Sequence, residues 1–409
     1  MKKIKNLYIV ILLLLVACST NSSKISKDKS DQKIERNKKV SVGLPILDLS
    51  KDYPKKKITL QDIADVEYIA LETNEDALLK STSIYITSNK IIASDLLGTI
   101  VIFDRRGKYL HSFNHKGQSG EEYRDPISIA VDNEEIFVVD FWKKCIQVYD
   151  YEGKYRRTLR LPAKSNFSSS IFNYNDDFLL GNDKYMVDTG KDDQTNKTPY
   201  CKISKKTGKL TPLPLKITKR IGDEFVQYID ELNSIGGTLG VSPLATFGSD
   251  GLIADFTLDT AYIYQNDVLQ PIAVRKNCVS NNNKPIISTI EFLTDRYQLW
   301  FTQEKNLDFK TKNVPEPVFY LIDKKINECY LIEFFNGDGV TWADVTTSIY
   351  ERLSANIHSV PPKYAIQIYK PEKLIKFNNE GKLKGKLKII ASKLKEDDNP
   401  VLMIAKFKE

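Results

Sequence analysis

The sequence predicts an all-β protein, a six-bladed β-propeller of four-stranded blades with a short helical excursion near the C-terminus. Three observations support this prediction. A strand–turn–strand pattern recurs after 46 residues, further strand matches precede both copies, and strand-like segments without a nearby hairpin partner occur towards both ends of the chain.

The recurring pattern is IFDRRGKY at residues 102–109 and VYDYEGKY at residues 148–155. Asp opens a tight turn because its carboxylate accepts backbone N–H groups, and Gly closes it where φ must be positive. The flanking residues are β-branched or aromatic, as strands prefer. Each copy therefore predicts a β-hairpin, with Gly107 and Gly153 in the left-handed region.

The similarity extends upstream, where KIIASD (90–95) matches EIFVVD (135–140) and SIYIT (83–87) matches SIAVD (128–132). Four short strands in roughly 45 residues are typical of a propeller blade. A four-stranded sheet has two apolar faces, so blades must stack around a ring to bury both. More diverged copies lie at 200–210, 251–272 and 318–334, and the length after Ser41 suits six blades with insertions.

Two terminal segments predict how the ring closes. Residues 65–72 (DVEYIALE) and 401–408 (VLMIAKFK) each lack a hairpin partner nearby, so pairing them in one blade would cover both edges. Between the last hairpin and the last strand, apolar residues from Leu374 to Leu394 recur at helical spacing, which favours a helix over a sixth hairpin turn at KFNNEGKL (376–383). Pro371 suits the first position of such a helix.

The first forty residues predict an export signal and a tether. Lys2, Lys3 and Lys5 precede an apolar run from Leu7 to Ala17, which is too short to span a membrane and has the length of a signal-peptide core. Residues 1–17 are therefore interpreted as a signal peptide, residues 18–40 as a disordered basic tether, and residues 41–409 as the propeller.

The segment LVAC, which ends at Cys18, resembles the bacterial lipobox. This resemblance implies cleavage before Cys18 and lipidation of that residue; an ordinary signal peptide with an incidental Cys is the alternative. The implied location is the cell envelope, as an outer-membrane lipoprotein that faces the periplasm.

Residues 134–159 resemble an NHL repeat, and residues 117–132 are similar to the glycine-rich connector between NHL blades. Ser119, Gly120 and Glu121 depart from the Gly-Pro-Gly often found there. With the lipobox and the terminal strands, the chain resembles the six-bladed β-propeller lipoproteins of Gram-negative bacteria. That resemblance implies a ring outside the cytoplasm and carries over no catalytic residue.

The net charge of +7 lies in the leader and the tether, so residues 41–409 sum to zero. A nucleic-acid-binding domain would carry the basic charge itself. We therefore predict no nucleic-acid partner, contact with the membrane through a lipid anchor only, and a protein, peptide or glycan ligand.

Four side chains are the candidates for a binding site: Trp142 and Trp300 as aromatic platforms, and His111 and His115 beside acidic residues. The alternatives are core packing for the aromatics and a solvated loop for the histidines. No catalytic and no metal-binding residue is assigned, because G-x-S-x-G, P-loop and H-E-x-x-H motifs are missing from the sequence.

Asp95, Asp140 and Asp255 recur at equivalent strand ends. They could bind Ca²⁺ as a ring of carboxylates, or accept backbone N–H groups of the following turns, and the second role is favoured. No other cofactor is predicted. The acidic segments 181–193 and 336–339 do not match an EF-hand loop, His358 stands alone, and no disulfide is expected between Cys145, Cys201, Cys278 and Cys329.

Two classes of function follow. The favoured one is a lipid-anchored binding or scaffold module. The alternative is an enzyme, a metal-dependent lyase or lactonase of the kind found among NHL-like rings. Because propellers host unrelated functions, the side chains of the site must decide between them.

Overall fold

The computed structural model describes residues 43–408, apart from the segments 164–170, 184–197, 218–220, 229–233, 309–313 and 342–363 and the positions 80–81, 96, 125, 223, 240, 248–249 and 282. Leu44–Glu409 forms one compact unit. The leader, Cys18 and the tether lie outside the described residues, as do His358 and most of the acidic segment 181–193.

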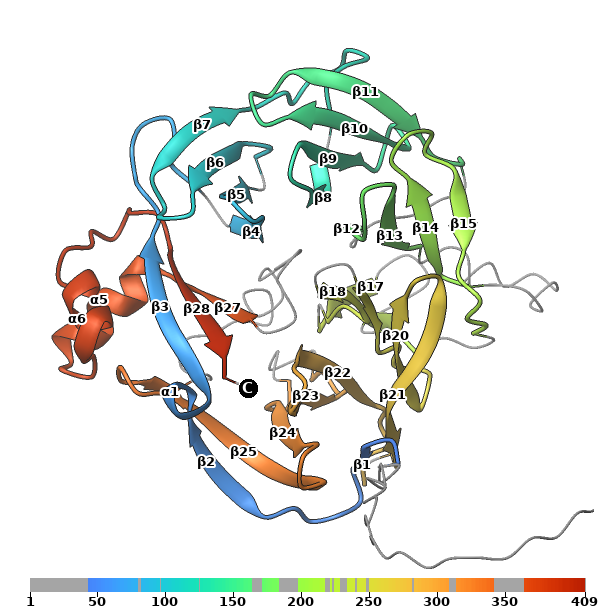
Figure 1. The fold of residues 1–409 in the computed structure, drawn as a ribbon, viewed down its shortest axis with the longest axis vertical. Helices are drawn as coiled ribbons and strands as arrows, with labels where there is room; N and C mark the ends of the chain where they lie inside the picture. Colours follow the sequence, from blue (N-terminus) through green and yellow to red (C-terminus); the bar gives the residue numbers. More distant parts are fainter. Residues whose placement is uncertain are drawn as a thin grey trace, which may run out of the picture. The chain divides into compact units, whose positions relative to one another are not determined.

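Six blades surround a central axis (Figure 1), as the sequence predicts. The innermost strands of the first two blades, for example, are β4 and β8. From the inside outwards, the first blade contains β4 (Thr82–Ile86), β5 (Lys90–Asp95), β6 (Ile100–Asp104) and β7 (Tyr109–Phe113), and the second contains β8 (Pro126–Val131), β9 (Glu135–Asp140), β10 (Cys145–Asp150) and β11 (Tyr155–Arg160). The third blade contains β12 (Ile171–Asn173), β13 (Phe178–Asn182), β14 (Tyr200–Ser204) and β15 (Leu210–Pro212), and the fourth contains β18 (Leu244–Phe247), β19 (Asp250–Ile253), β20 (Thr260–Gln265) and β21 (Val268–Lys276). The fifth blade contains β22 (Ile286–Leu293), β23 (Tyr297–Glu304), β24 (Val318–Asp323) and β25 (Glu328–Asn336).

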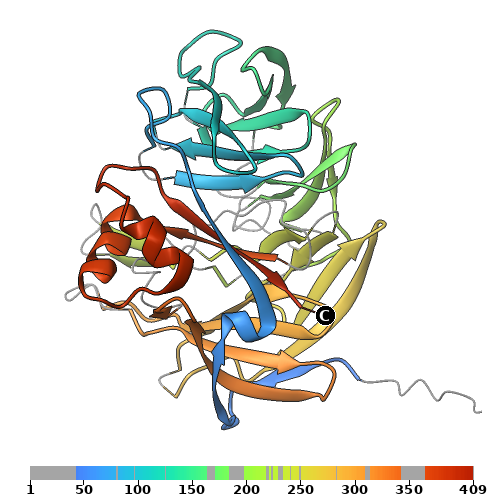
Figure 2. The ribbon, with the colours of Figure 1, turned by 60° about the vertical axis from the view of Figure 1, so that its left-hand side comes forward.

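The sixth blade closes the ring with strands from both ends of the chain. Its described strands are β27 (Tyr364–Tyr369), β28 (Val401–Phe407) and β3 (Ala64–Ala70), in that order. β28 pairs antiparallel with β3, from Val401 opposite Ala70 to Phe407 opposite Ala64. The predicted pairing of the two terminal segments is therefore confirmed (Figure 2).

The helical excursion is also confirmed. It consists of α5 (Pro371–Asn379) and α6 (Gly385–Ala391), with Pro371 in the first turn of α5. Leu374, Leu383 and Leu387 are buried in the core at the ring closure. The two helices lie outside the ring beside β3 and β28 (Figure 2).

Before β3, the N-terminal segment also covers the outer edges of two further blades, which the sequence did not predict. β1 (Ile46–Asp48) pairs in parallel with β21 of the fourth blade, and β2 (Lys55–Thr59) pairs in parallel with β25 of the fifth. The short helix α1 (Leu60–Ile63) then leads into β3 of the sixth blade. Outer strands that would otherwise expose unpaired backbone groups are thus paired.

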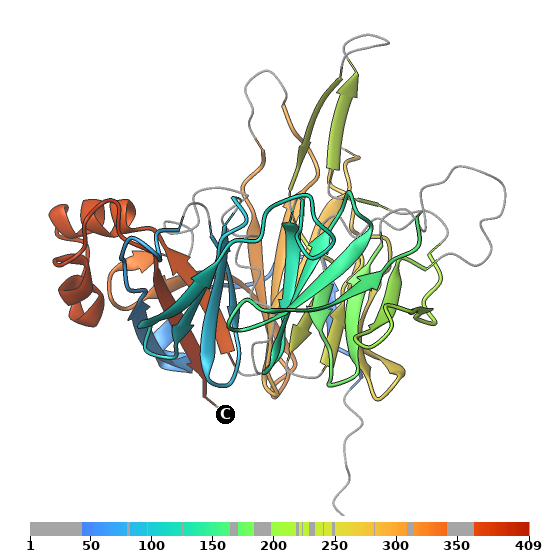
Figure 3. The ribbon, with the colours of Figure 1, turned by 90° about the horizontal axis from the view of Figure 1, so that it is seen from above.

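Two small additions complete the described strands. β26 (Val340–Thr341) pairs with β25, and β16 (Glu224–Tyr228) pairs with β17 (Ser234–Thr238) as a two-stranded hairpin. This hairpin interrupts the connection between the third and fourth blades. It rises from one face of the ring (Figure 3).

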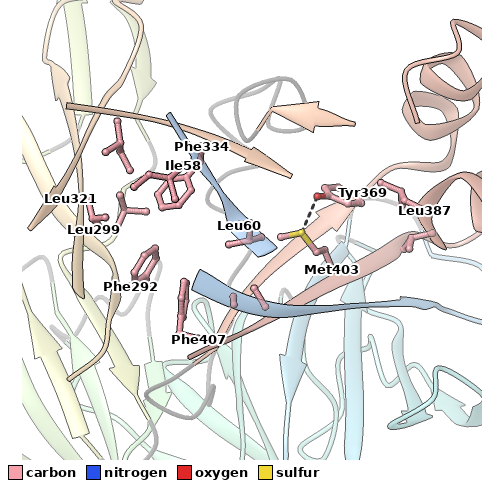
Figure 4. Close-up of a cluster of buried hydrophobic side chains, with 14 of the residues drawn as sticks. Ile58, Leu60, Phe292, Leu299, Leu321, Phe334, Tyr369, Leu387, Met403 and Phe407 are labelled. Carbon is pink, nitrogen blue, oxygen red and sulfur yellow. Dashed lines mark hydrogen bonds between the residues drawn. The ribbon is translucent and has the colours of Figure 1, made fainter. Parts of the chain in front are cut away.

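The core lies between the blades, and neighbouring residues of one strand serve different interfaces. Leu299 packs in the cluster between the fifth and sixth blades, whereas Trp300 packs between the fourth and fifth. This follows from the period of two in a strand. At the closing interface, Phe292 stacks on Phe407 with ring centroids 4.1 Å apart, and the Tyr369 hydroxyl donates to Met403 Sδ at 3.0 Å (Figure 4).

The turn glycines have two roles. Gly107 and Gly153 have φ values of +83° and +77°, which confirms the predicted left-handed turns, and Gly208 in the third blade has a φ of +74°. Each also packs against the outer strand of the preceding blade. A Cβ on Gly107 would lie 2.5 Å from the Ala70 carbonyl oxygen, and a Cβ on Gly153 would lie 2.7 Å from the Phe113 ring.

Candidate ligand-binding face

Long connections gather on one face of the ring, which we call the loop face. In a four-stranded antiparallel blade, the loop between the second and third strands and the connector to the next blade leave from the same side. The hairpin β16–β17 rises there, as do the described ends of the loop after β23, residues 305–308 and 314–317 (Figure 3). The turns of the opposite side are short, as at 105–108, 151–154 and 266–267. Long loops on a rigid scaffold are where binding sites concentrate.

Aspartates at the ends of the second strands shape the loop face. Asp95 Oδ1 accepts backbone N–H groups from Leu97 and Thr99 at 2.9 and 2.8 Å. Asp140 Oδ1 accepts those of Trp142 and Lys143 at 3.0 and 2.9 Å. These carboxylates cap turns, which is the favoured one of the two roles predicted from the sequence.

Asp255 has the same role at the fourth blade. Its Oδ1 accepts the Thr257 N–H at 2.9 Å, and its Oδ2 accepts the Tyr200 hydroxyl at 2.6 Å. Both side chains are buried. The bond links the third blade to the fourth beneath the loop face.

An exposed aromatic–basic patch follows β9, formed by Arg124, Phe141, Trp142 and Lys144. Trp142 is 60% exposed, which is rare for so large an apolar side chain. The Arg124 guanidinium lies 5.7 Å from the centre of the Trp142 ring, and the Lys144 ammonium lies 3.9 Å from that of Phe141. The two aromatic rings meet edge to face at 5.2 Å. Trp and Arg side chains of this kind are typical anchors in protein interfaces.

The connector between the first two blades holds this patch from one side. Lys143 Nζ donates to the carbonyl oxygens of Ser119 and Glu122 at 2.7 and 2.6 Å, and the Tyr149 hydroxyl donates to Glu121 O at 2.6 Å. The Ser119 N–H donates to the Glu122 carboxylate and holds its pKa below the usual range. The Arg124 N–H donates to Asp140 Oδ2 at 2.6 Å. The patch is therefore built on a fixed backbone.

His111 and His115 lie away from the patch and hold a turn of the next blade. His111 Nε2 lies 3.1 Å from Glu152 O, and His115 Nε2 lies 2.7 Å from Gly153 O. The His115 ring stacks on Tyr149 at 5.2 Å. Both histidines thus contact backbone carbonyls at the interface between the first two blades.

Trp300 is fully buried in β23, between the fourth and fifth blades. This position corresponds to core packing, the alternative given for Trp300. The buried indole cannot contact a ligand on the surface. Of the four candidates, Trp142 alone belongs to the aromatic–basic patch. Arg124 was missed, because a single Arg before a Pro-containing strand has no distinguishing sequence signal.

In the part of the chain that the structure describes, no three His, Cys, Asp or Glu side chains are grouped to hold a metal ion. In the segment 336–339, Asn336 and Asp338 accept hydrogen bonds from Gln61 and Tyr68. The four cysteines after Cys18 are free, as predicted. Burial raises the pKa of Cys145 to about 11 and that of Cys329 to about 12.

A closed ring of six blades with one loop-bearing face defines the protein as a six-bladed β-propeller. The chain belongs to the family described as DUF4934, a domain of unknown function, whose model matches residues 44–406. None of the curated proteins matches the sequence. The described residues contain no helix with the length and apolar character of a membrane span.

Two solved structures are similar to this chain. A protein of Bacteroides fragilis described as "putative exported protein" is 14% identical, with a TM-score of 0.60 over 89% of this chain and 100% of that one. A member of the DUF4221 family from Bacteroides vulgatus is 12% identical, with a TM-score of 0.46 over 85% of this chain and 99% of that one. At this identity the first likeness shows the fold alone.

Proposed function

We propose that this protein is a lipid-anchored, extracytoplasmic binding module that holds a protein, peptide or glycan on its loop face. The aromatic–basic patch around Trp142 carries this proposal. A 60% exposed Trp on a fixed backbone offers a rigid apolar surface, and it lies beside the Arg124 guanidinium. Little conformational entropy is lost when a ligand packs on such a surface.

The location is supported by two independent observations. The segment LVAC at the end of an apolar run has the composition of a lipoprotein signal. A structural neighbour with the same fold is described as an exported protein. The proposal places the ring on the far side of the inner membrane, attached through Cys18.

Replacing Trp142 with Ala should weaken ligand binding about 10–30-fold, since exposed Trp anchors commonly contribute about 1.4–2 kcal/mol to binding. Panels of immobilised oligosaccharides and peptides, probed with the labelled propeller protein, would identify the class of ligand. Titration of the ligand that binds then gives the ratio of dissociation constants. Arg124→Ala should weaken binding less, because the Trp142 surface remains.

Ile326→Ala is the matched control. Ile326 is 51% exposed and lies in the short turn between β24 and β25, on the side opposite the loop face. This variant should bind like the wild type. Equal affinities for the wild type and Trp142→Ala would contradict the role of the patch.

Cys18→Ser should release the protein from the membrane fraction or leave the leader uncleaved, because the thiol that would carry the lipid is missing. Fractionation of cells with detergent partitioning, together with the N-terminal mass of the mature chain, measures both effects. A Cys18→Ser protein that is processed and fractionates like the wild type would contradict the anchor.

A further inference from the structure

The helical excursion carries an unusual density of positive charge. Residues 370–395 contain nine Lys and two Glu, although residues 41–409 as a whole sum to zero. Eight of these lysines are exposed, and the five on and next to α6 form what we call the lysine surface: Lys384, Lys386, Lys388, Lys393 and Lys395. The remainder of the ring therefore carries a compensating excess of acidic residues.

The packing of α6 directs this charge outwards. Leu387 and Ala391 are buried against the ring, and Leu383 precedes them in the same core. Lys386 and Ile389 are three residues apart and share the opposite face of α6. Ile389 is 59% exposed, so the lysine surface includes an apolar side chain that nothing in the described ring covers.

No ion pair joins the five lysines to carboxylates among the described residues, whereas Lys382 nearby pairs with Glu380 at 2.7 Å. The acidic run 396–398 begins just after Lys395, and Asp398 Oδ2 accepts the Lys395 backbone N–H at 2.8 Å. Asn399 then donates to Glu72 O and turns the chain back into the ring. The lysine charges are thus available to an external anion.

We infer that the lysine surface docks on an anionic membrane, with its ammonium groups among the lipid head groups and Ile389 at the acyl boundary. Clusters of lysines near a membrane are attracted to anionic head groups, and an exposed apolar side chain among them can enter the boundary with the acyl chains. The choice of a membrane over an acidic protein rests on the anchor proposed at Cys18. Only 24 residues separate Cys18 from Gly43, so a lipid on Cys18 would keep the ring close to a membrane.

The test uses a chain that begins at residue 41, since Leu44–Glu409 is a compact unit and both Cys18 and the basic tether are then removed. Co-sedimentation with phosphatidylcholine vesicles containing about 30% phosphatidylglycerol should show binding that vesicles of phosphatidylcholine alone do not. About 0.5 M NaCl should abolish it by screening. A variant with Lys384, Lys386, Lys388 and Lys393 changed to Ala should partition at least tenfold less.

The matched control removes the same charge elsewhere: Lys55, Lys154, Lys206 and Lys209, all exposed, are changed to Ala. This control should keep the wild-type partition coefficient within about twofold. Ile389→Ser should weaken binding without changing its salt dependence. Failure of the wild type to bind the anionic vesicles, or equal losses in both quadruple variants, would overturn the inference. Release by inorganic phosphate beyond that by NaCl of equal ionic strength would overturn it as well, because it would indicate a site for a single phosphate group.

Because the shortened chain that begins at residue 41 lacks Cys18, its binding to vesicles does not depend on lipidation. Cleavage of the leader in the Cys18→Ser protein, in turn, does not depend on the lysine surface. Loss of binding at the Trp142 patch leaves vesicle binding unchanged. Failure of the inference and failure of the proposed function can therefore be told apart.

Discussion

Deletion of the last ten residues should abolish the cooperative unfolding transition. These residues contain β28, which lies between β27 and β3 and is their common partner. Val401, Leu402, Met403, Ile404 and Phe407 are all at most 3% exposed. Burial of five such side chains contributes roughly 8–15 kcal/mol as an upper estimate, which matches the whole stability of an ordinary domain. Denaturant and thermal melts followed by circular dichroism measure the effect.

A synthetic peptide that spans residues 399–409 provides the control for this deletion. If closure through β28 is what fails, the added peptide should restore a transition, since it supplies both missing strand pairings. A truncated protein that melts like the full chain would show that the ring is stable without its closing strand.

Gly107→Ala should destabilise the protein by roughly 2–5 kcal/mol, the sum of about 1–2 for left-handed strain and about 1–3 for overpacking. The added Cβ would lie 2.5 Å from the carbonyl oxygen of Ala70, a backbone atom that cannot rotate away. Gly153→Ala should cost somewhat less, because its neighbour is the Phe113 side chain, which can shift. The midpoints of urea melts, with unchanged slopes, give these values.

Gly381 supplies a matched control. It has a φ of +69°, but a Cβ there would meet nothing within 4 Å. Gly381→Ala should therefore show the strain alone, about 1–2 kcal/mol. The double variant of Gly107 and Gly153 should be additive, since the two turns pack on different blades. If all three glycines cost the same, packing of the turns against the preceding blade contributes nothing.

Much of the fold could be predicted because each hairpin is encoded locally and because the two closing strands lack local partners. The Asp and Gly of each hairpin encode a turn, and the lack of partners for residues 65–72 and 401–408 indicates their pairing. β1 and β2 escaped prediction because they pair in parallel with the outer strands of distant blades. Pairing with the edge of a distant blade gives β1 and β2 no periodic pattern of apolar residues that would identify them in the sequence.

The candidate site could be predicted in part. Trp142 follows a strand-end Asp and was selected, but its exposure could not be separated from the burial of Trp300 by pattern. Nearly every residue of β23 is buried, on both of its faces, so the alternation that usually distinguishes core from surface is missing there. The resemblance to NHL repeats and the lipid anchor remain predictions.

Hydrogen exchange in the presence of a ligand from the panels tests the central claim, that the loop face binds, most directly. The prediction is added protection at residues 114–124 and 141–144, where the connector and the aromatic–basic patch lie, with exchange unchanged in the turns 105–108 and 266–267. Protection confined to those opposite turns, with the loop face unaffected, would contradict it.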